Sequence, residues 1–139
     1  DIRSELWVKL WGNLSFNPVS ALTHATLEDI AGFAPSRELV TQMMQEAQAV
    51  AERSGIQFKI SIDKRIAGAQ AVGAHKTSML QDIEAGRPIE KNALVGSIIE
   101  LGKIVGIPTP HITTVYACIS LLAKTLQDHS GSLKIQTSV

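Results

Sequence analysis

The sequence predicts an all-α domain of six to eight helices, and three observations support this prediction. Apolar residues recur at spacings of three and four along most of the 139 residues, and no convincing alternating stretch indicates a strand. Prolines and glycines divide the chain into helix-sized segments. Hydrophobic residues make up 45% of the chain, enough for a core in one domain of this length. We therefore expect a single helical domain over residues 1–139.

The first expected helix covers residues 2–16. Pro18 disfavours helical geometry at the residue before it, so the helix should bend or stop there. Pro18 also suits the first position of a new helix, with Asn17 as its N-cap. A short helix over residues 19–24 is then expected.

Two later helix starts have a side chain suited to cap them. Thr26 precedes residues 27–31, and Ser61 precedes a weaker helix that two glycines interrupt. Residues 57–60 could pass for a strand, but the run is short and has no partner, so we interpret it as a linker.

The clearest helix follows Pro35 and runs over residues 37–53, with Gly55 to end it. One face of it is apolar, with Leu39, Val40, Met43, Met44, Ala47, Val50 and Ala51.

The last third of the chain should contain three helices. They cover residues 79–85, 89–105 and 110–126, and they are separated by segments that contain glycine and proline. The polar tail from Ser130 is expected to be mobile.

Composition argues against several classes of function. The 13 basic and 13 acidic residues cancel and form no basic run, so no nucleic-acid partner is expected. No apolar run approaches the roughly 18 residues of a membrane span, and no signal peptide is visible, so we expect a cytoplasmic protein. The scattered histidines and single cysteine predict no metal site. That cysteine, Cys118, lies among apolar residues of a predicted helix and should be a buried, inert thiol.

Three polar residues, Lys9, Asn13 and Asn17, recur every four residues in the apolar first segment. A helix places such positions one above another. A cation with two amides above it could bind a small oxygen-rich anion. The same pattern is also typical of a partly exposed helix stripe, and the spacing alone does not separate the two.

A second polar stretch spans residues 75–96. Ser78 and Gln81 have capping-box spacing, which favours a helix start at Ser78. Alternatively, the Ser78 hydroxyl could help to bind a carboxylate. Glu90 follows a Gly-Arg-Pro turn and could simply be a carboxylate favoured in the first turn of a helix.

Taken together, the two stretches resemble a known family. The order Lys-x3-Asn-x3-Asn-Pro, then SMLQD, GRPxE and GIPTP, is similar to the C-terminal domain of ketopantoate reductase (2-dehydropantoate 2-reductase). The resemblance implies a helical domain like the C-terminal domain of 6-phosphogluconate dehydrogenase, beside an N-terminal Rossmann domain that binds NADPH. Because the chain starts at Asp1 and lacks a glycine fingerprint, we expect it to be the helical half only, and inactive alone.

The resemblance also implies roles for five residues. Lys9 matches the catalytic lysine, which would donate a proton to the developing alkoxide, and Glu90 matches the acidic residue that assists it. Asn13 and Asn17 match substrate-binding asparagines, and Ser78 matches the serine that holds the substrate carboxylate.

The implied reaction is the NADPH-dependent reduction of ketopantoate to pantoate in pantothenate and coenzyme A biosynthesis. The motif Ile-Glu-Lys-Asn replaces the family's Thr-Glu-Ile-Asp, and some members have asparagine where this chain has His75. The roles of His75 and Asn92 and the exact 2-oxo acid therefore stay open. The alternatives are a related 2-oxo acid reductase and a non-catalytic helical interaction module. A homodimer is also expected, partly through apolar surface that a missing domain would expose, with Trp7 and Trp11 as candidates.

Overall fold

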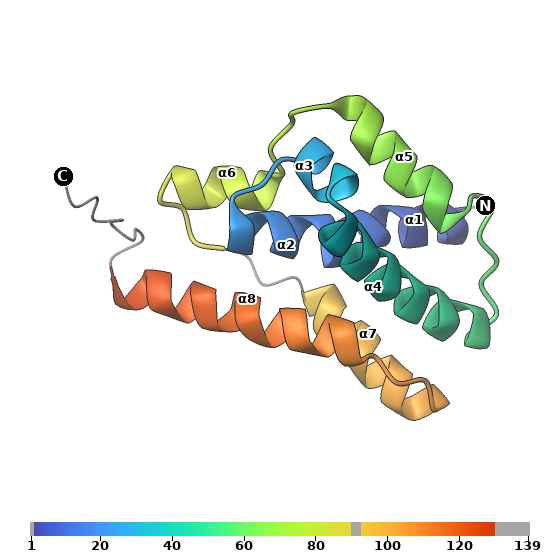
Figure 1. Cartoon of the computed structure of the whole chain (residues 1–139). Helices are drawn as coiled ribbons and strands as arrows, with labels where there is room; N and C mark the ends of the chain where they lie inside the picture. The colour runs from blue at the N-terminus through green and yellow to red at the C-terminus, as the bar shows by residue number, and fades with distance from the viewer. Residues whose placement is uncertain (1, 90–92, 130–139) are drawn as a thin grey trace.

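The computed structural model describes residues 2–89 and 93–129. Within these ranges the chain forms eight α-helices and no strand, which confirms the predicted all-α class (Figure 1). The helices are α1 (Ile2–Leu14), α2 (Phe16–Thr23), α3 (Leu27–Gly32), α4 (Ala34–Arg53), α5 (Ile62–Val72), α6 (Ser78–Glu84), α7 (Ala93–Val105) and α8 (Pro110–Asp128).

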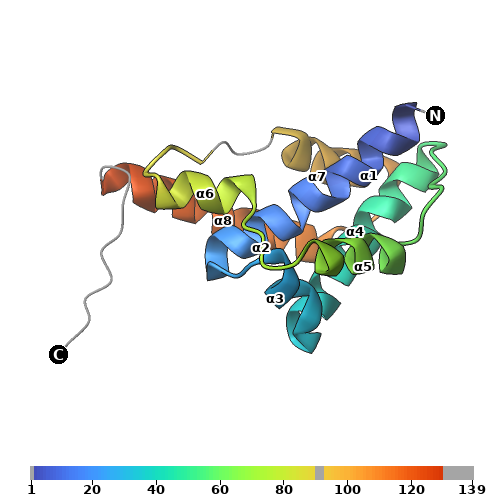
Figure 2. The same ribbon diagram turned by 90° about the horizontal axis from the view of Figure 1, so that it is seen from above.

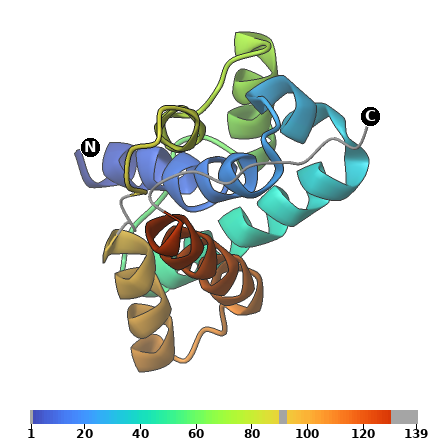
Figure 3. The same cartoon turned by 90° about the vertical axis from the view of Figure 1, so that its left-hand side faces the viewer.

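Helices α1 and α2 follow one another through the middle of the molecule, and the other helices surround them (Figure 3). Helices α3 and α5 pack together on one side, and α8 contacts α2 from the opposite side (Figure 1). Helix α4 contacts α1, α3, α5, α7 and α8, so it joins the two sides. Helix α6 lies beside α2 (Figures 1 and 2).

The break between α1 and α2 lies at Ser15, so the prediction that Asn17 caps a new helix is wrong. Asn17 is the second residue of α2, and Ser15 is the residue before that helix. The cause is Pro18, which has no N–H to bond the carbonyl of Leu14 and whose ring crowds that carbonyl. The helix therefore ends at residue 14, a full turn before the proline.

The capping predictions for Thr26 and Ser61 are confirmed. Thr26 forms a capping box with Asp29 at the start of α3, and the Ser61 hydroxyl accepts a hydrogen bond from the Lys64 N–H at the start of α5. Helix α4 ends before Gly55, whose φ of 89° lies in the left-handed region that favours glycine. Residues 57–60 form neither helix nor strand, as the linker prediction requires.

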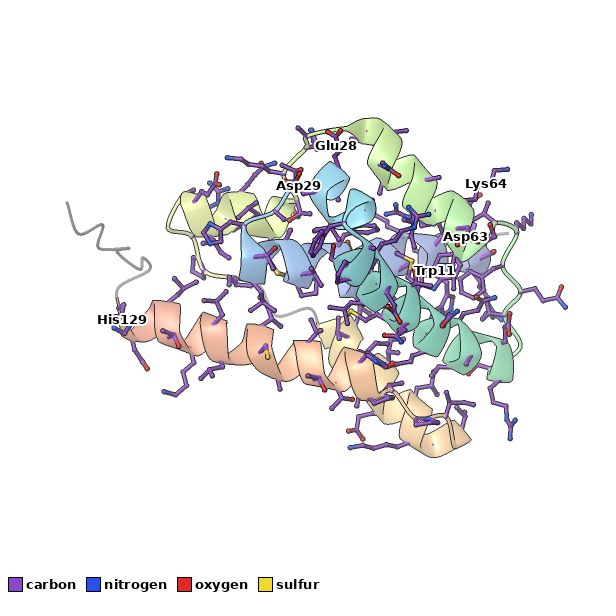
Figure 4. All side chains as sticks on the ribbon, in the orientation of Figure 1. Trp11, Glu28, Asp29, Asp63, Lys64 and His129 are labelled. Atoms are coloured by element: carbon purple, nitrogen blue, oxygen red, sulfur yellow. The ribbon has the colours of Figure 1, made fainter. Side chains whose placement is uncertain are left out.

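The core gathers around α1, α2, α4 and α8, and six of the seven apolar residues predicted on α4 are fully buried. Two other burial predictions are wrong. Trp11 is buried, because it stacks on Phe58 with ring centroids 4.2 Å apart, and it lies inside the helical layers (Figure 4). Cys118 does lie within α8, but its side chain is exposed because α8 buries the face with Val115 and Ile119.

The last observations concern α7, the chain end, and candidate membrane spans and metal sites. Ile89 is not helical, and α7 is described from Ala93, because residues 90–92 lie outside the described ranges; so does the tail from Ser130. No helix of the described part is both long and apolar enough to cross a membrane. Within residues 2–89 and 93–129, no three His, Cys, Asp or Glu side chains lie close enough together to hold a metal ion.

Candidate active site

The three polar residues of the first segment lie along α1 and α2 as the spacing predicts. Lys9 and Asn13 are one turn apart on α1, and Asn17 follows across the break at Ser15. Lys9 is exposed, and both asparagines are half-buried. In the described part of the chain, Lys9 makes no hydrogen bond and no ion pair, so its ammonium group is available to a ligand.

A hydrogen bond across the break fixes how the two amides face a ligand. Asn17 Nδ2 donates to Asn13 Oδ1 over 3.2 Å. An amide group carries two N–H donors and one carbonyl acceptor. Asn13 therefore keeps its two N–H donors for a ligand, and Asn17 keeps its carbonyl oxygen. The pair offers donors on one side and an acceptor on the other.

The second polar stretch is attached to the first by two buried hydroxyl groups. Ser20 Oγ on α2 donates to the carbonyl of Asn17 over 2.9 Å and is hydrogen-bonded to Thr77 Oγ1. Since the Ser20 proton is already used, the Thr77 hydroxyl must donate in that second bond. Thr77 Oγ1 in turn accepts a hydrogen bond from the Leu80 N–H over 3.2 Å. The start of α6 is thereby held against the backbone of Asn17.

A small cavity also shows that the start of α6 lies close to Asn13. It measures about 20 Å³, and its walls come from α1, α2, α6, α7 and α8. Asn13 lines it together with Met79, the residue after Ser78, and the rest of the lining is mostly apolar: Leu14, Pro18, Val95, Ile112, Tyr116 and Ile119. Residues 13 and 79, far apart in sequence, therefore meet at one space the size of a single water molecule.

Helix α6 begins at Ser78 as predicted, but Ser78 is not its N-cap. Thr77 is the N-cap of α6, and Ser78 is the first residue of the helix, with an exposed side chain. The reason is tertiary, because the contact with buried Ser20 selects Thr77 over its neighbour. Gln81 does not complete a capping box with Ser78, since its amide donates to the carbonyl of Lys76. The Ser78 hydroxyl is left facing solvent.

The structure thus brings together Asn13, Asn17 and the start of α6, where Ser78 lies. Lys9 adjoins Asn13 on α1 and makes no hydrogen bond with Ser78 in the described ranges. Glu90 and Asn92 lie outside the described residues. The side chain of His75 is exposed, and its backbone carbonyl accepts a hydrogen bond from the Leu27 N–H.

A cation that the sequence analysis did not select lies against Gly12, the residue before Asn13. Arg65 on α5 places its guanidinium carbon 5.7 Å from the centre of the Phe16 ring. A Cβ atom added to Gly12 would lie 2.5 Å from Arg65 Nη2, so the guanidinium group fills the space beside this glycine. Burial lowers the pKa of Arg65 from its ordinary value, although an arginine stays charged at any ordinary pH.

These additional residues have only weak signals in the sequence. Ser20 and Thr77 are common polar residues 57 positions apart, and their pairing depends on how α2 and α6 pack. For Arg65, the one local signal was a glycine in the interior of a predicted helix, at position 12. Such a glycine often marks a close approach by another group.

Comparison with known proteins supports the resemblance. Residues 1–123 match the family model described as "Ketopantoate reductase PanE/ApbA C terminal". A 2-dehydropantoate 2-reductase from Mesorhizobium japonicum is 58% identical over 123 residues, which cover 88% of this chain and 38% of the relative.

Two solved structures have the same fold. A 2-dehydropantoate 2-reductase from Methylococcus capsulatus is 31% identical with a TM-score of 0.80, over 96% of this chain and 45% of the other. A dimeric ketopantoate reductase from Staphylococcus aureus is 25% identical with a TM-score of 0.72, over 90% and 44%. This chain therefore spans less than half the length of these relatives, and it belongs to the ketopantoate reductase family, whose C-terminal domain it matches.

Proposed function

We propose that this chain is the helical substrate-binding part of an NADPH-dependent 2-dehydropantoate 2-reductase, which reduces ketopantoate to pantoate. The observation that carries the proposal is the hydrogen-bonded pair Asn13 and Asn17 beside the unpaired ammonium group of Lys9. Family membership supports the same reaction. The Mesorhizobium relative, at 58% identity, is named for it.

Lys9 would donate the proton that the reaction requires. Reduction of a ketone develops negative charge on the carbonyl oxygen, and a lysine ammonium can both attract that oxyanion and protonate it. The exposure of Lys9 and its lack of a partner in the described ranges leave this group available to a substrate.

The amide pair would bind the other oxygens of the substrate without adding charge. Asn13 would donate its free N–H groups to the reacting carbonyl oxygen, next to Lys9. Asn17 would accept a hydrogen bond from the substrate hydroxyl through its free carbonyl oxygen. The bond between the two amides keeps each in one orientation, which reduces the entropy lost on binding.

Ser78 and Glu90 complete the proposed site. The Ser78 hydroxyl, exposed at the start of α6, would donate to the substrate carboxylate. Glu90, outside the described residues, would orient the Lys9 ammonium group and stabilise its charge.

The nucleotide would be bound mainly outside this chain. The sequence contains no glycine-rich phosphate loop, and no strand occurs in the described residues to precede one. When bound, NADPH supplies the hydride. The residues of this chain orient the keto acid, stabilise its oxygen and deliver the proton, so the chain without a nucleotide-binding region should be inactive.

The proposal is tested in the complete reductase by the loss of NADPH absorbance with ketopantoate. Lys9→Ala should lower kcat by about a hundredfold or more, because it removes the general acid, while circular dichroism stays unchanged. Lys64→Ala is the control, since it removes an exposed charge from α5. Normal turnover of the Lys9 variant would refute the assignment.

The choice of substrate has its own test. Steady-state kinetics should give ketopantoate a much higher kcat/KM than pyruvate or other 2-oxo acids that lack its hydroxyl group. Equal values would replace ketopantoate by another 2-oxo acid and leave the reductase chemistry in place.

Self-association is the last part of the proposal. The Staphylococcus relative is dimeric, and we propose that this chain also pairs, in part through Ile2 and Leu6, which are 76% and 61% exposed on α1. Leu6→Glu should then lower the mass in analytical ultracentrifugation. Leu121→Glu, at a similarly exposed leucine of α8, is the control.

A further inference from the structure

Arg65 has a cationic group with donors that nothing in the described protein accepts. The distance to Phe16 matches a cation–π contact, which uses none of the hydrogen-bond donors of the guanidinium group. The five N–H donors point outward in the plane of the group. No carboxylate or carbonyl in the described ranges accepts from them, although the side chain is half-buried.

An unpaired cation in partly apolar surroundings is unfavourable unless something else binds it. Some exposed cations of this chain do have acidic partners: Arg87 pairs with Asp82 over 2.9 Å, and Lys76 pairs with Glu84 over 2.8 Å. Arg65 and Lys9 differ from these two residues in having none. Both therefore have donors free for an external anion.

Gly12 makes room for this arrangement. Glycine in a helix interior is less stable than alanine by roughly 1 kcal/mol. At position 12, however, a Cβ would collide with Arg65 Nη2 at 2.5 Å. The glycine thus lets the guanidinium group lie directly on the surface of α1.

That place on α1 adjoins the proposed active site. Residues three apart on a helix are surface neighbours, with Cβ atoms about 5–6 Å apart. Gly12 is three residues after Lys9 and next to Asn13. Arg65 therefore lies against α1 within about one helical turn of Lys9, although it comes from a different helix.

We propose that Arg65 is a second cation of the Lys9 site and binds an oxyanion there, either the carboxylate of the keto acid or a phosphate of the nucleotide. The proposal adds a residue to the proposed function and deepens it. Arg65 acts by two parallel N–H···O bonds, the geometry that a guanidinium group forms with either anion.

A binding experiment on this chain tests the proposal without any need for activity. The Nε–H signal of Arg65 is followed by NMR, assigned by its loss in Arg65→Lys, while oxalate or inorganic phosphate is added. The signal should shift and saturate at roughly millimolar anion. The shift should be lost in Gly12→Ala, which displaces the guanidinium group but keeps its charge, and should persist in Lys64→Met. Lys64 points away from the body of the molecule (Figure 4).

The two anions distinguish the two possible origins of the oxyanion, the keto acid and the nucleotide. A response to oxalate alone identifies the substrate carboxylate, and a response to phosphate alone identifies the nucleotide. No response to either anion, or an equal response in Gly12→Ala, overturns the proposal.

Kinetics of the complete reductase provide a second test of the role of Arg65. Arg65→Met should raise KM roughly tenfold or more for the keto acid or for NADPH, matching the anion that binds, with a smaller change in kcat. Gly12→Ala should have the same effect, and none when added to Arg65→Met, because both act on one contact. Unchanged KM values in both single variants overturn the role of Arg65. Anion binding without turnover of any 2-oxo acid would refute the proposed function and retain the Arg65 site.

Discussion

The carboxylate of Glu46 on α4 caps the start of α8 through the backbone of His111. Glu46 Oε1 accepts a hydrogen bond from the His111 N–H over 2.7 Å and from the Ile112 N–H over 3.2 Å. Thr109, the residue before α8, makes no side-chain cap. A side chain 65 residues away in sequence therefore supplies the cap that the local sequence lacks.

Removing this cap should destabilise the fold. Glu46→Ala leaves two N–H groups at the start of α8 unpaired, so we expect a loss of about 1–2 kcal/mol in the free energy of unfolding by urea. Glu52→Ala, an exposed glutamate of the same helix, should change it by less than about 0.5 kcal/mol. Equal losses in both variants would contradict the capping role.

Substitution of Thr77 should lower stability, whereas substitution of Ser78 should weaken substrate binding. Thr77→Val removes the cap of α6 and leaves the buried hydroxyl of Ser20 with one partner fewer, at a cost of about 1–3 kcal/mol in urea unfolding. Ser78→Ala removes an exposed hydroxyl and should leave stability unchanged while it raises KM for the keto acid. A stability loss in Ser78→Ala and none in Thr77→Val would restore Ser78 as the cap.

Two glycines in helices should respond to alanine in opposite directions. At Gly102 a Cβ would lie 2.8 Å from the carbonyl oxygen of Ile107 and 3.2 Å from Thr109 Cγ2, so Gly102→Ala should lower the melting temperature. Gly68 on α5 has no atom within 4 Å of such a Cβ. Gly68→Ala should therefore stabilise the protein by about 0.5–1 kcal/mol. Calorimetry of the two variants measures both effects.

The orientation of the amide pair predicts an asymmetric response to aspartate. Asn13→Asp can still accept from Asn17 but has no N–H left for the substrate carbonyl, so kcat and kcat/KM should both fall. Asn17→Asp keeps an acceptor for the substrate hydroxyl and should affect kcat less. Steady-state kinetics of the complete reductase would contradict the orientation if Asn17→Asp had the larger effect on kcat.

Local sequence rules predicted the elements whose causes are local. The caps Thr26 and Ser61 and the buried face of α4 depend on residues within one or two turns, and they were found. The break at Ser15 was also predictable in principle, because proline excludes the carbonyl four residues before it. The prediction placed the break one residue before Pro18 instead.

Features that depend on distant residues escaped prediction. Trp11 is buried because Phe58 comes to stack on it, and Thr77 rather than Ser78 caps α6 because Ser20 lies opposite. Arg65 became visible only once α5 was placed against Gly12. For Lys9, Asn13, Asn17 and Ser78, the order of motifs identified the family, and their roles stay predictions that the variants above can test.

The hydroxyl contact between Ser20 and Thr77 also has a consequence for folding kinetics. The two residues are 57 positions apart, so their contact forms only after a long loop has closed, whereas α1 and α2 can form from local contacts. Lys9, Asn13 and Asn17 can thus be arranged early, while Ser78 reaches them only when the chain is nearly native. In a refolding experiment, ligand binding should therefore return with the slowest folding phase, after most of the helical circular dichroism signal has returned.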